Sequence, residues 1–177
     1  QNSGFEITLN YTAVNTKDYG LDFAFTLGRN KNKVVSLGDM QSYTKASYWA
    51  STEVGADYII EPGKPVGSIY GYVTDGRYEI SDFAGYENGK WVLKDGVADD
   101  SGVVGVVRPG TLKLKNMTEG DNIVNDDDKT IIGDANAFAV GGFSINGRVK
   151  GFDLNANFTY SIGNDIYNAD KIDQTST

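Results

Sequence analysis

The sequence predicts an all-β, antiparallel fold built around four long strands. Apolar and polar residues alternate with a period of two in four segments, short turns join these segments into two hairpins, and helical periodicity is nearly absent. Such alternation over about ten residues gives a strand one apolar and one polar face. The only helix candidate is Tyr43–Thr52, and its Ser, Thr and aromatic residues make it a poor helix former.

Composition argues against most classes of enzyme. The chain has 177 residues, 16 basic and 24 acidic side chains, a net charge of −8, and neither cysteine nor histidine. These absences exclude disulfides, cysteine-based zinc sites and a Ser-His-Asp triad within the chain. The acidic balance argues against nucleic-acid binding, which needs a basic surface. We therefore expect no catalytic residue and no enzyme activity.

The first predicted hairpin spans residues 1–30, with a short polar turn at residues 15–20. In both of its strands, every second residue is apolar. The apolar positions are Phe5, Ile7, Leu9, Tyr11 and Ala13 in the first strand and Leu21, Phe23, Phe25 and Leu27 in the second.

Residues 31–136 form a long region between the hairpins, rich in Gly, Asp, Tyr and Ser. We expect short strands inside it at Tyr58–Ile60, Ile69–Val73 and Trp91–Leu93. A connection of this length is uncommon in a compact domain, so it indicates a functional loop or a different architecture.

The second predicted hairpin spans residues 137–168, and Lys150-Gly151 is its tight turn. Its last strand has the clearest alternation. The apolar positions there are Phe152, Leu154, Ala156, Phe158, Tyr160 and Ile162. Residues 169–177 would begin the next loop. Because both ends look like cuts, we expect a piece of a larger protein.

Amphipathic strands fit two architectures. In a soluble β-sandwich the apolar faces pack against each other, whereas in a transmembrane barrel they face lipid and the polar faces line a wet lumen. Strands of about 9–11 residues suit a tilted membrane strand, and short turns alternate with a long loop as in outer-membrane barrels. Aromatic residues also lie near the strand ends, where interfacial girdles occur: Phe5, Tyr11, Phe152 and Tyr160. Since four strands are too few to close a barrel, a barrel would make the chain a fragment.

Ordered motifs add a family resemblance. The chain reads NKNKVVSLG at residues 30–38 and EPGKPVGSIYGYVTDGRYE at residues 61–79. Between residues 108 and 168 it contains RPGTLKLKNMTEGDNI, DKTIIGD and KGFDLNANFTYSIGNDIYN. In this order, the motifs resemble the C-terminal half of the barrel of SusC/RagA-type TonB-dependent outer-membrane transporters. The resemblance extends from about Gly4 to Asn168.

The resemblance implies a barrel of about 22 strands filled by a plug. It further implies import of a glycan or peptide, a surface SusD-like lipoprotein as partner, and energy from the TonB complex through an N-terminal part that this chain lacks. The chain would then contribute barrel wall and extracellular loop in the cell outer membrane, in contact with lipid. The alternative from the residues alone is a soluble, secreted β-sandwich that binds glycans.

Three aromatic residues of the long region are candidate contacts for a substrate or partner: Tyr70, Tyr72 and Trp91. Aromatic faces stack on sugar rings and anchor interfaces. The alternative is that these rings pack the loop against itself.

A weak remnant of a calcium loop lies where the family has a D-x-N-G-D-G-x-I segment. Its candidate ligands are Asn116, Thr118, Asp121 and Asp127. Gly120 provides no side-chain ligand at the fifth position, and Asp121 replaces the glycine needed at the sixth. The alternative is a solvated acidic turn, so we expect neither calcium nor another cofactor.

Overall fold

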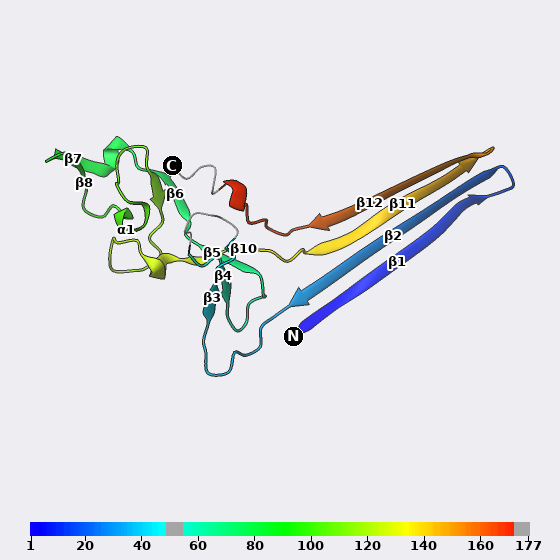
Figure 1. Ribbon diagram of the computed structural model, residues 1–177, viewed down its shortest axis with the longest axis horizontal. Helices are drawn as coiled ribbons and strands as arrows, with labels where there is room; N and C mark the ends of the chain where they lie inside the picture. Colours follow the sequence, from blue (N-terminus) through cyan, green and yellow to red (C-terminus); the bar gives the residue numbers. More distant parts are fainter. Residues whose placement is uncertain (49–54, 172–177) are drawn as a thin grey trace. The chain divides into compact units, whose positions relative to one another are not determined.

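The computed structural model describes residues 1–48 and 55–171, and Figure 1 shows its strands and short helical turns. The predicted all-β, antiparallel class is confirmed. The strands are β1 (Asn2–Asn15), β2 (Tyr19–Asn32), β3 (Tyr43–Lys45), β4 (Tyr58–Ile60), β5 (Ser68–Gly71), β6 (Thr74–Arg77), β7 (Phe83–Glu87), β8 (Lys90–Leu93), β9 (Leu112–Leu114), β10 (Thr130–Asp134), β11 (Ala139–Val149) and β12 (Phe152–Ile162). The labelled helical turns are η1 (Ile80–Asp82), α1 (Ser101–Val104) and η2 (Asp126–Asp128), and residues 169–171 are also helical.

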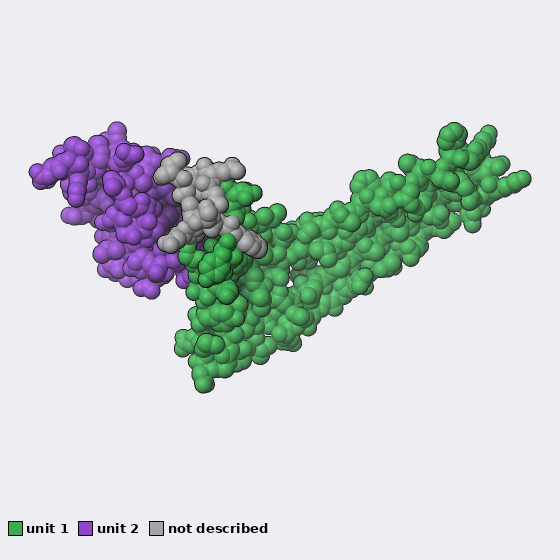
Figure 2. Space-filling model, viewed as in Figure 1, with its two compact units in different colours: residues 1–69, 133–177 green, residues 70–132 purple. Residues whose placement is uncertain are grey.

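The chain divides into two compact units, coloured separately in Figure 2. The first comprises residues 1–69 and 133–177, and the second comprises residues 70–132. The first contains the long strands β1, β2, β11 and β12, whereas the second contains the short elements from β6 to η2.

The four long strands form one antiparallel sheet in the order β1-β2-β11-β12, which we call the long sheet. In Figure 1 these strands run side by side, although β2 and β11 are far apart in the sequence. Within the described residues the sheet stays open, with β1 and β12 at its edges.

Register gives the long sheet one apolar face. Residues directly opposite each other in an antiparallel pair project on the same side. The central row of partners is Leu9, Phe25, Phe143 and Phe158, and the row beside it is Tyr11, Phe23, Ile145 and Ala156. The rings of Phe143 and Phe158 stack with their centroids 4.5 Å apart. The alternation read from each strand therefore combines into a continuous apolar surface.

Both hairpin turns are tight. Lys150 and Gly151 have positive φ angles of 47° and 89°, which a two-residue turn matched to the strand twist requires. At the other turn, the Thr16 amide donates to the Tyr19 carbonyl over 2.7 Å, and the Tyr19 amide donates to Thr16 Oγ1 over 3.0 Å. The Lys150 amide also donates to the Asp18 carbonyl over 2.8 Å, which links the two turns.

The region between the hairpins contains short strands close to the predicted positions. β4 spans the predicted residues Tyr58–Ile60. β5 is Ser68–Gly71 where Ile69–Val73 was predicted, and β8 is Lys90–Leu93 where Trp91–Leu93 was predicted. The weak helix candidate at Tyr43–Thr52 is not helical at its start, since Tyr43–Lys45 form β3 and pair with β4. Pairing across strands suits Tyr and Thr better than a helix does. Residues 49–52 of that prediction lie outside the described part.

Among the described residues, buried apolar side chains lie almost entirely outside the long sheet. They are Ile59, Ile69, Tyr78, Phe83, Leu114, Val124 and Ala139, of which only Ala139 belongs to the long sheet. Large apolar side chains of the long sheet are exposed instead, for example Leu9 at 59% and Phe152 at 82%. No helix among the described residues is long and apolar enough to cross a membrane.

Candidate functional site

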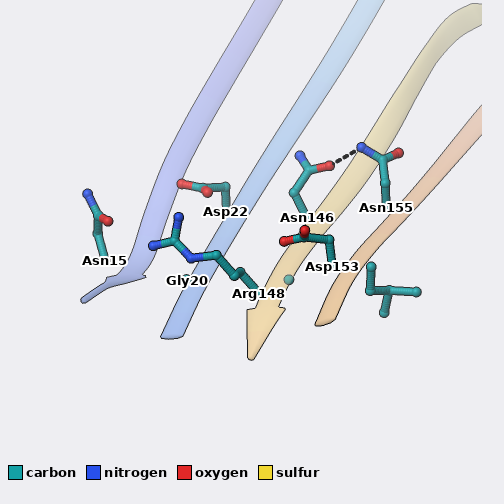
Figure 3. Close-up of a pocket in the computed structure, with 9 residues that line it drawn as sticks. Asn15, Gly20, Asp22, Asn146, Arg148, Asp153 and Asn155 are labelled. Carbon is teal, nitrogen blue, oxygen red and sulfur yellow. Dashed lines mark hydrogen bonds between the residues drawn. The ribbon is translucent and has the colours of Figure 1, made fainter. Parts of the chain in front are cut away.

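The polar face of the long sheet carries a row of hydrogen-bonding side chains. Thr12, Asp22, Asn146 and Asn155 occupy one row of partners across all four strands. Thr12 Oγ1 donates to Asp22 Oδ1 over 2.6 Å, and Asn155 Nδ2 donates to Asn146 Oδ1. Figure 3 shows the Asn146–Asn155 bond among the residues that line a surface pocket. This pocket has a volume of about 340 Å³. This face offers donors and acceptors to water or a polar partner.

Arg148 ties this polar face to the hairpin turn. It projects from β11 toward β2 (Figure 3), and its Nη2 donates to the Thr16 carbonyl over 2.8 Å. Its strand partner on β12 is Asp153. The tight-turn end of the long sheet is thus held by side chains as well as by backbone bonds.

At the opposite end, a hydrogen-bonded group that we call the collar joins the ends of three long strands. It consists of Asn32, Val66, Asp134, Asn136 and Asp165. Asn32 Oδ1 accepts from the Val66 amide over 2.6 Å, and Asn32 Nδ2 donates to Asn136 Oδ1 over 2.7 Å. Asn136 Nδ2 donates to the Val66 carbonyl over 2.7 Å. The Asp134 amide donates to Asp165 Oδ2 over 2.8 Å.

The collar brings together motifs that are separated in the sequence. Asn32 ends β2 in the NKNK segment, Val66 lies in the GKPVG segment, Asn136 precedes β11, and Asp165 follows β12 in the GNDIYN segment. Gly67 has a φ of 100°, and a β-carbon there would lie 3.2 Å from Asn136 Nδ2. Each motif therefore supplies one part of a single network that fixes where the chain leaves the long sheet.

Asp57 provides a second anchor near β4. Its Oδ1 accepts from the Tyr167 hydroxyl over 2.8 Å, and its Oδ2 accepts from the Ser47 amide over 2.7 Å. Burial would raise the pKa of Asp57, but the hydrogen bonds from Ser47 and Tyr167 hold it below its ordinary value. The side chain is therefore a charged acceptor that orders two loops.

The acidic loop at residues 116–128 is organised around Asp128. This buried carboxylate accepts through Oδ1 from the Met117 amide over 2.6 Å and the Thr118 amide over 2.9 Å, and through Oδ2 from the Asn125 amide over 2.8 Å. The Asn125 hydrogen bond, with those from Met117 and Thr118, outweighs burial and lowers the pKa of Asp128. The sequence did not single out Asp128, because it follows Asp126 and Asp127 and no local pattern shows which of the three carboxylates is buried.

The four calcium-loop candidates make different contacts. Asn116 Nδ2 donates to the Asp121 carbonyl over 2.8 Å, and the Thr118 amide donates to Asn116 Oδ1 over 2.9 Å. Asp121 Oδ1 accepts from the Ile123 amide over 3.1 Å, while Asp127 is exposed. Within the described ranges, no group of three or more acidic, histidine or cysteine side chains is placed to hold a metal ion.

Tyr72 takes part in a local polar cluster. Its hydroxyl donates to Asp126 Oδ1 over 3.0 Å, and Lys129 Nζ lies 5.1 Å from its ring centroid and 2.7 Å from the same Asp126 oxygen. Burial, the hydrogen bond to Asp126 and the nearby carboxylate charges raise the pKa of Tyr72 to about 12. The hydroxyl therefore stays protonated and remains a donor to Asp126.

Trp91 belongs to a separate aromatic cluster on the β7–β8 hairpin. Its ring lies 5.2 Å from Phe83 and 5.3 Å from Tyr86, centroid to centroid. Trp91 is 36% exposed and Tyr86 is 61% exposed, so one side of this cluster faces solvent. Tyr70 is half-buried in β5. Tyr72 and Trp91 thus contact different neighbours.

Tyr78 and Asp100 form the buried polar centre of residues 70–132, which the sequence did not single out. The Tyr78 hydroxyl lies 2.6 Å from the Ala98 carbonyl and 2.8 Å from Asp100 Oδ1, and it shares its single proton between these acceptors. Asp100 Oδ2 accepts from the Leu114 amide over 2.8 Å. Burial and the Asp100 hydrogen bond raise the pKa of Tyr78.

Two curated relatives match nearly the whole chain. TonB-dependent receptor P3 of Formosa agariphila is 30% identical over 168 residues, which cover 95% of this chain. TonB-dependent receptor P39 of the same organism is 25% identical over an alignment of 187 positions, which covers 94% of this chain. The chain spans 15% and 17% of the lengths of these relatives. No family model matches the chain.

A solved structure has the same fold over most of the chain. In the RagAB peptide transporter, one chain matches 92% of the present chain with a TM-score of 0.56 and 21% identity, over 15% of its own length. With the two relatives, this match confirms the resemblance to SusC/RagA-type TonB-dependent outer-membrane transporters predicted from the motifs. These similar proteins are named as receptors or as a transporter, not as enzymes.

Proposed function

We propose that this chain is a segment of an outer-membrane TonB-dependent importer, to which it contributes barrel wall and an extracellular loop region. The supporting observation is the long sheet, which has one continuous apolar face and one polar face. In this proposal the apolar face contacts lipid and the polar row of Asp22 and Asn146 lines a wet lumen. The segment does no bond chemistry.

Physical chemistry favours lipid as the neighbour of the apolar face. Removing a large apolar side chain from water stabilises a protein by about 1.5–3 kcal/mol, yet Leu9, Phe143 and Leu154 are exposed. A β-sandwich would cover such residues with a second apolar sheet. Within the described residues, no such sheet covers this face, so the sandwich alternative is not favoured.

The open edges of the long sheet agree with a segment of a larger barrel. In hydrocarbon, each unpaired backbone amide or carbonyl costs several kcal/mol, so every membrane strand needs a neighbour on both sides. In this proposal β1 and β12 each pair with a further strand of the same receptor. The short turns would then face the periplasm and the collar would hold the loops on the outer side.

Substrate and partners form the finer part of this proposal. We assign the importer a glycan or peptide substrate, a SusD-like surface lipoprotein and energy from the TonB complex, without calcium or another cofactor. The exposed aromatic cluster of Trp91 and Tyr86 has the chemistry to stack on a sugar ring or anchor a partner. Tyr70 and Tyr72 remain candidate contacts of the same kind.

Cysteine labelling tests the wall assignment. The chain has no native cysteine, so single substitutions such as Leu9→Cys and Thr8→Cys mark opposite faces of β1 in the receptor that carries it. In lipid vesicles, we expect the Thr8→Cys thiol to react with a water-soluble maleimide and the Leu9→Cys thiol to be protected from it. Equal reactivity on both faces would contradict a lipid-facing wall.

Uptake measurements test the finer assignment. Deleting β7–β8 (residues 83–93) should reduce uptake of the receptor's substrate while the labelling pattern of the wall persists. Uptake at the normal rate in this deletion, at equal receptor amounts, would exclude a role for the aromatic cluster.

A further inference from the structure

We propose that the collar-side end of β2 binds phosphate groups of anionic lipid headgroups. This inference rests on the proposed function, because it requires the apolar face of the long sheet to lie in a membrane. Every second residue of β2 projects on that face. The row begins with apolar residues and changes abruptly to basic ones, in the order Leu21, Phe23, Phe25, Leu27, Arg29 and Lys31, with Lys33 one residue beyond the strand.

Strand pairing places these cations at the margin of the apolar surface. Arg29 is the partner of Phe5, and Lys31 is the partner of Ser3. The pairing continues past the strand, since the Lys33 amide donates to the Gln1 carbonyl over 2.8 Å. Residues two apart in a strand rise by about 7 Å, so the three cations extend over about 13 Å from the hydrocarbon-facing residues toward the polar region.

The side chains are available to an anion. The Arg29 guanidinium is held over the Phe138 ring at 4.2 Å. A surface hollow of about 270 Å³ lies beside it, lined by Ser3, Gly4, Phe5, Arg29 and Lys31. In the part of the chain that the structure describes, none of the three cations forms an ion pair. The neighbouring Asp134 carboxylate accepts instead from the Asn136 amide over 2.9 Å.

Phosphate fits the chemistry of this arrangement. Guanidinium and ammonium groups are the usual protein ligands of phosphate. In membranes, long basic side chains reach from the apolar band to the headgroups, where anionic lipids carry phosphate. The chain as a whole has a net charge of −8, so a row of three cations at the margin of its apolar face gives an anionic lipid surface a local site of attraction.

Lipid titration of the receptor that carries this chain tests the proposal. The purified receptor in detergent is titrated with phosphatidic acid, and bound lipid is counted by native mass spectrometry. Each basic residue near an anionic lipid surface contributes roughly a factor of five in affinity. We therefore expect the Arg29→Gln, Lys31→Gln, Lys33→Gln variant to bind phosphatidic acid about a hundredfold more weakly.

Two matched variants serve as controls. The charge-preserving variant Arg29→Lys, Lys31→Arg, Lys33→Arg should retain binding. The variant Lys17→Gln, Lys150→Gln, which removes the lysines of the hairpin turns, should also retain it. Unchanged binding by the triple glutamine variant, or equal binding of phosphatidylcholine by the wild type, would overturn the proposal. Competition by inorganic phosphate at the same concentration as the lipid would point to a free-phosphate site instead.

The cysteine-labelling experiment separates this inference from the function on which it rests. If Leu9→Cys is protected in vesicles and the triple glutamine variant still binds phosphatidic acid normally, only the lipid site is wrong. If Leu9→Cys reacts freely with the aqueous reagent, the membrane wall itself is wrong.

Discussion

The long sheet and residues 70–132 place the same kinds of side chain in opposite environments. In residues 70–132, Tyr78 and Val124 are each only 1% exposed, and the carboxylates of Asp100 and Asp128 are buried with hydrogen-bond partners. In the long sheet, Leu9 is 59% and Leu154 is 66% exposed. Residues 70–132 bury their apolar side chains, as a domain surrounded by water does. The exposed apolar side chains of the long sheet are favourable only in apolar surroundings.

Two tyrosines show the same contrast between a buried and an exposed environment. Tyr78 is enclosed, and its hydroxyl is satisfied by Ala98 and Asp100. Tyr11 is 66% exposed near the end of β1, on the apolar face. A hydroxyl at the end of an apolar strand suits the interface between lipid and water. A substitution in residues 70–132 should therefore change stability through lost internal packing. A substitution on the apolar face of the long sheet should change stability through its contact with lipid.

The largest expected effect follows from Tyr78→Ala. Losing a fully buried aromatic ring typically costs about 3–5 kcal/mol, and here Asp100 also loses a donor. Hydrogen exchange in the receptor should show loss of protection in β6 and β9 while β2 and β11 keep theirs. Tyr78→Phe is the control and should cost only about 1–3 kcal/mol. Simultaneous loss of protection in the long strands would contradict independent units.

A charge on the apolar face should have the next largest effect. Phe143→Arg lies in the central row of the long sheet and should cost about 2–4 kcal/mol in the receptor folded into lipid vesicles, measured by urea unfolding. Ser144→Arg, one residue along β11 and on the polar face, should be nearly neutral. If both variants lost a similar amount of unfolding free energy, the two faces of the sheet would be in contact with the same surroundings.

Asp128→Asn tests the organisation of the acidic loop. The pKa of Asp128 is lowered in the folded chain, so its contribution to stability is present at neutral pH and is lost as the pH falls below its ordinary value of about 3.8. We expect the variant to lose about 2 kcal/mol at neutral pH, since three backbone amides donate to this carboxylate. Limited proteolysis of residues 116–128 should become less pH-dependent. An unchanged acid transition would exclude Asp128 as its cause.

The smallest expected effect is that of Asp127→Asn. Its side chain is exposed, so the free energy of unfolding should change by less than about 0.5 kcal/mol. Thermal melting with and without added calcium should give the same midpoint for the wild type and the variant. A calcium-dependent rise in the midpoint that this variant removes would restore the calcium-loop interpretation.

The sequence predicted the parts of the fold that depend on local periodicity. Alternation along Phe23 and Phe25, or along Leu154 and Phe158, is visible in the chain itself, because side chains of a strand alternate between faces. It did not predict the inward turn of Asp128, the enclosure of Tyr78 or the network around Asn136. Those depend on partners distant in the sequence, such as Asn32, which bonds a side chain 104 positions away.

The sequence by itself therefore determined the antiparallel class, the two amphipathic hairpins and the motif order that resembles TonB-dependent transporters. Tertiary structure alone decided how the hairpins join, because the β2–β11 register depends on backbone bonds between segments that no local pattern connects. It also decided which polar residues become structural. A carboxylate or amide side chain can face solvent or accept hydrogen bonds inside the fold. Its burial and the donors around it decide which of these occurs.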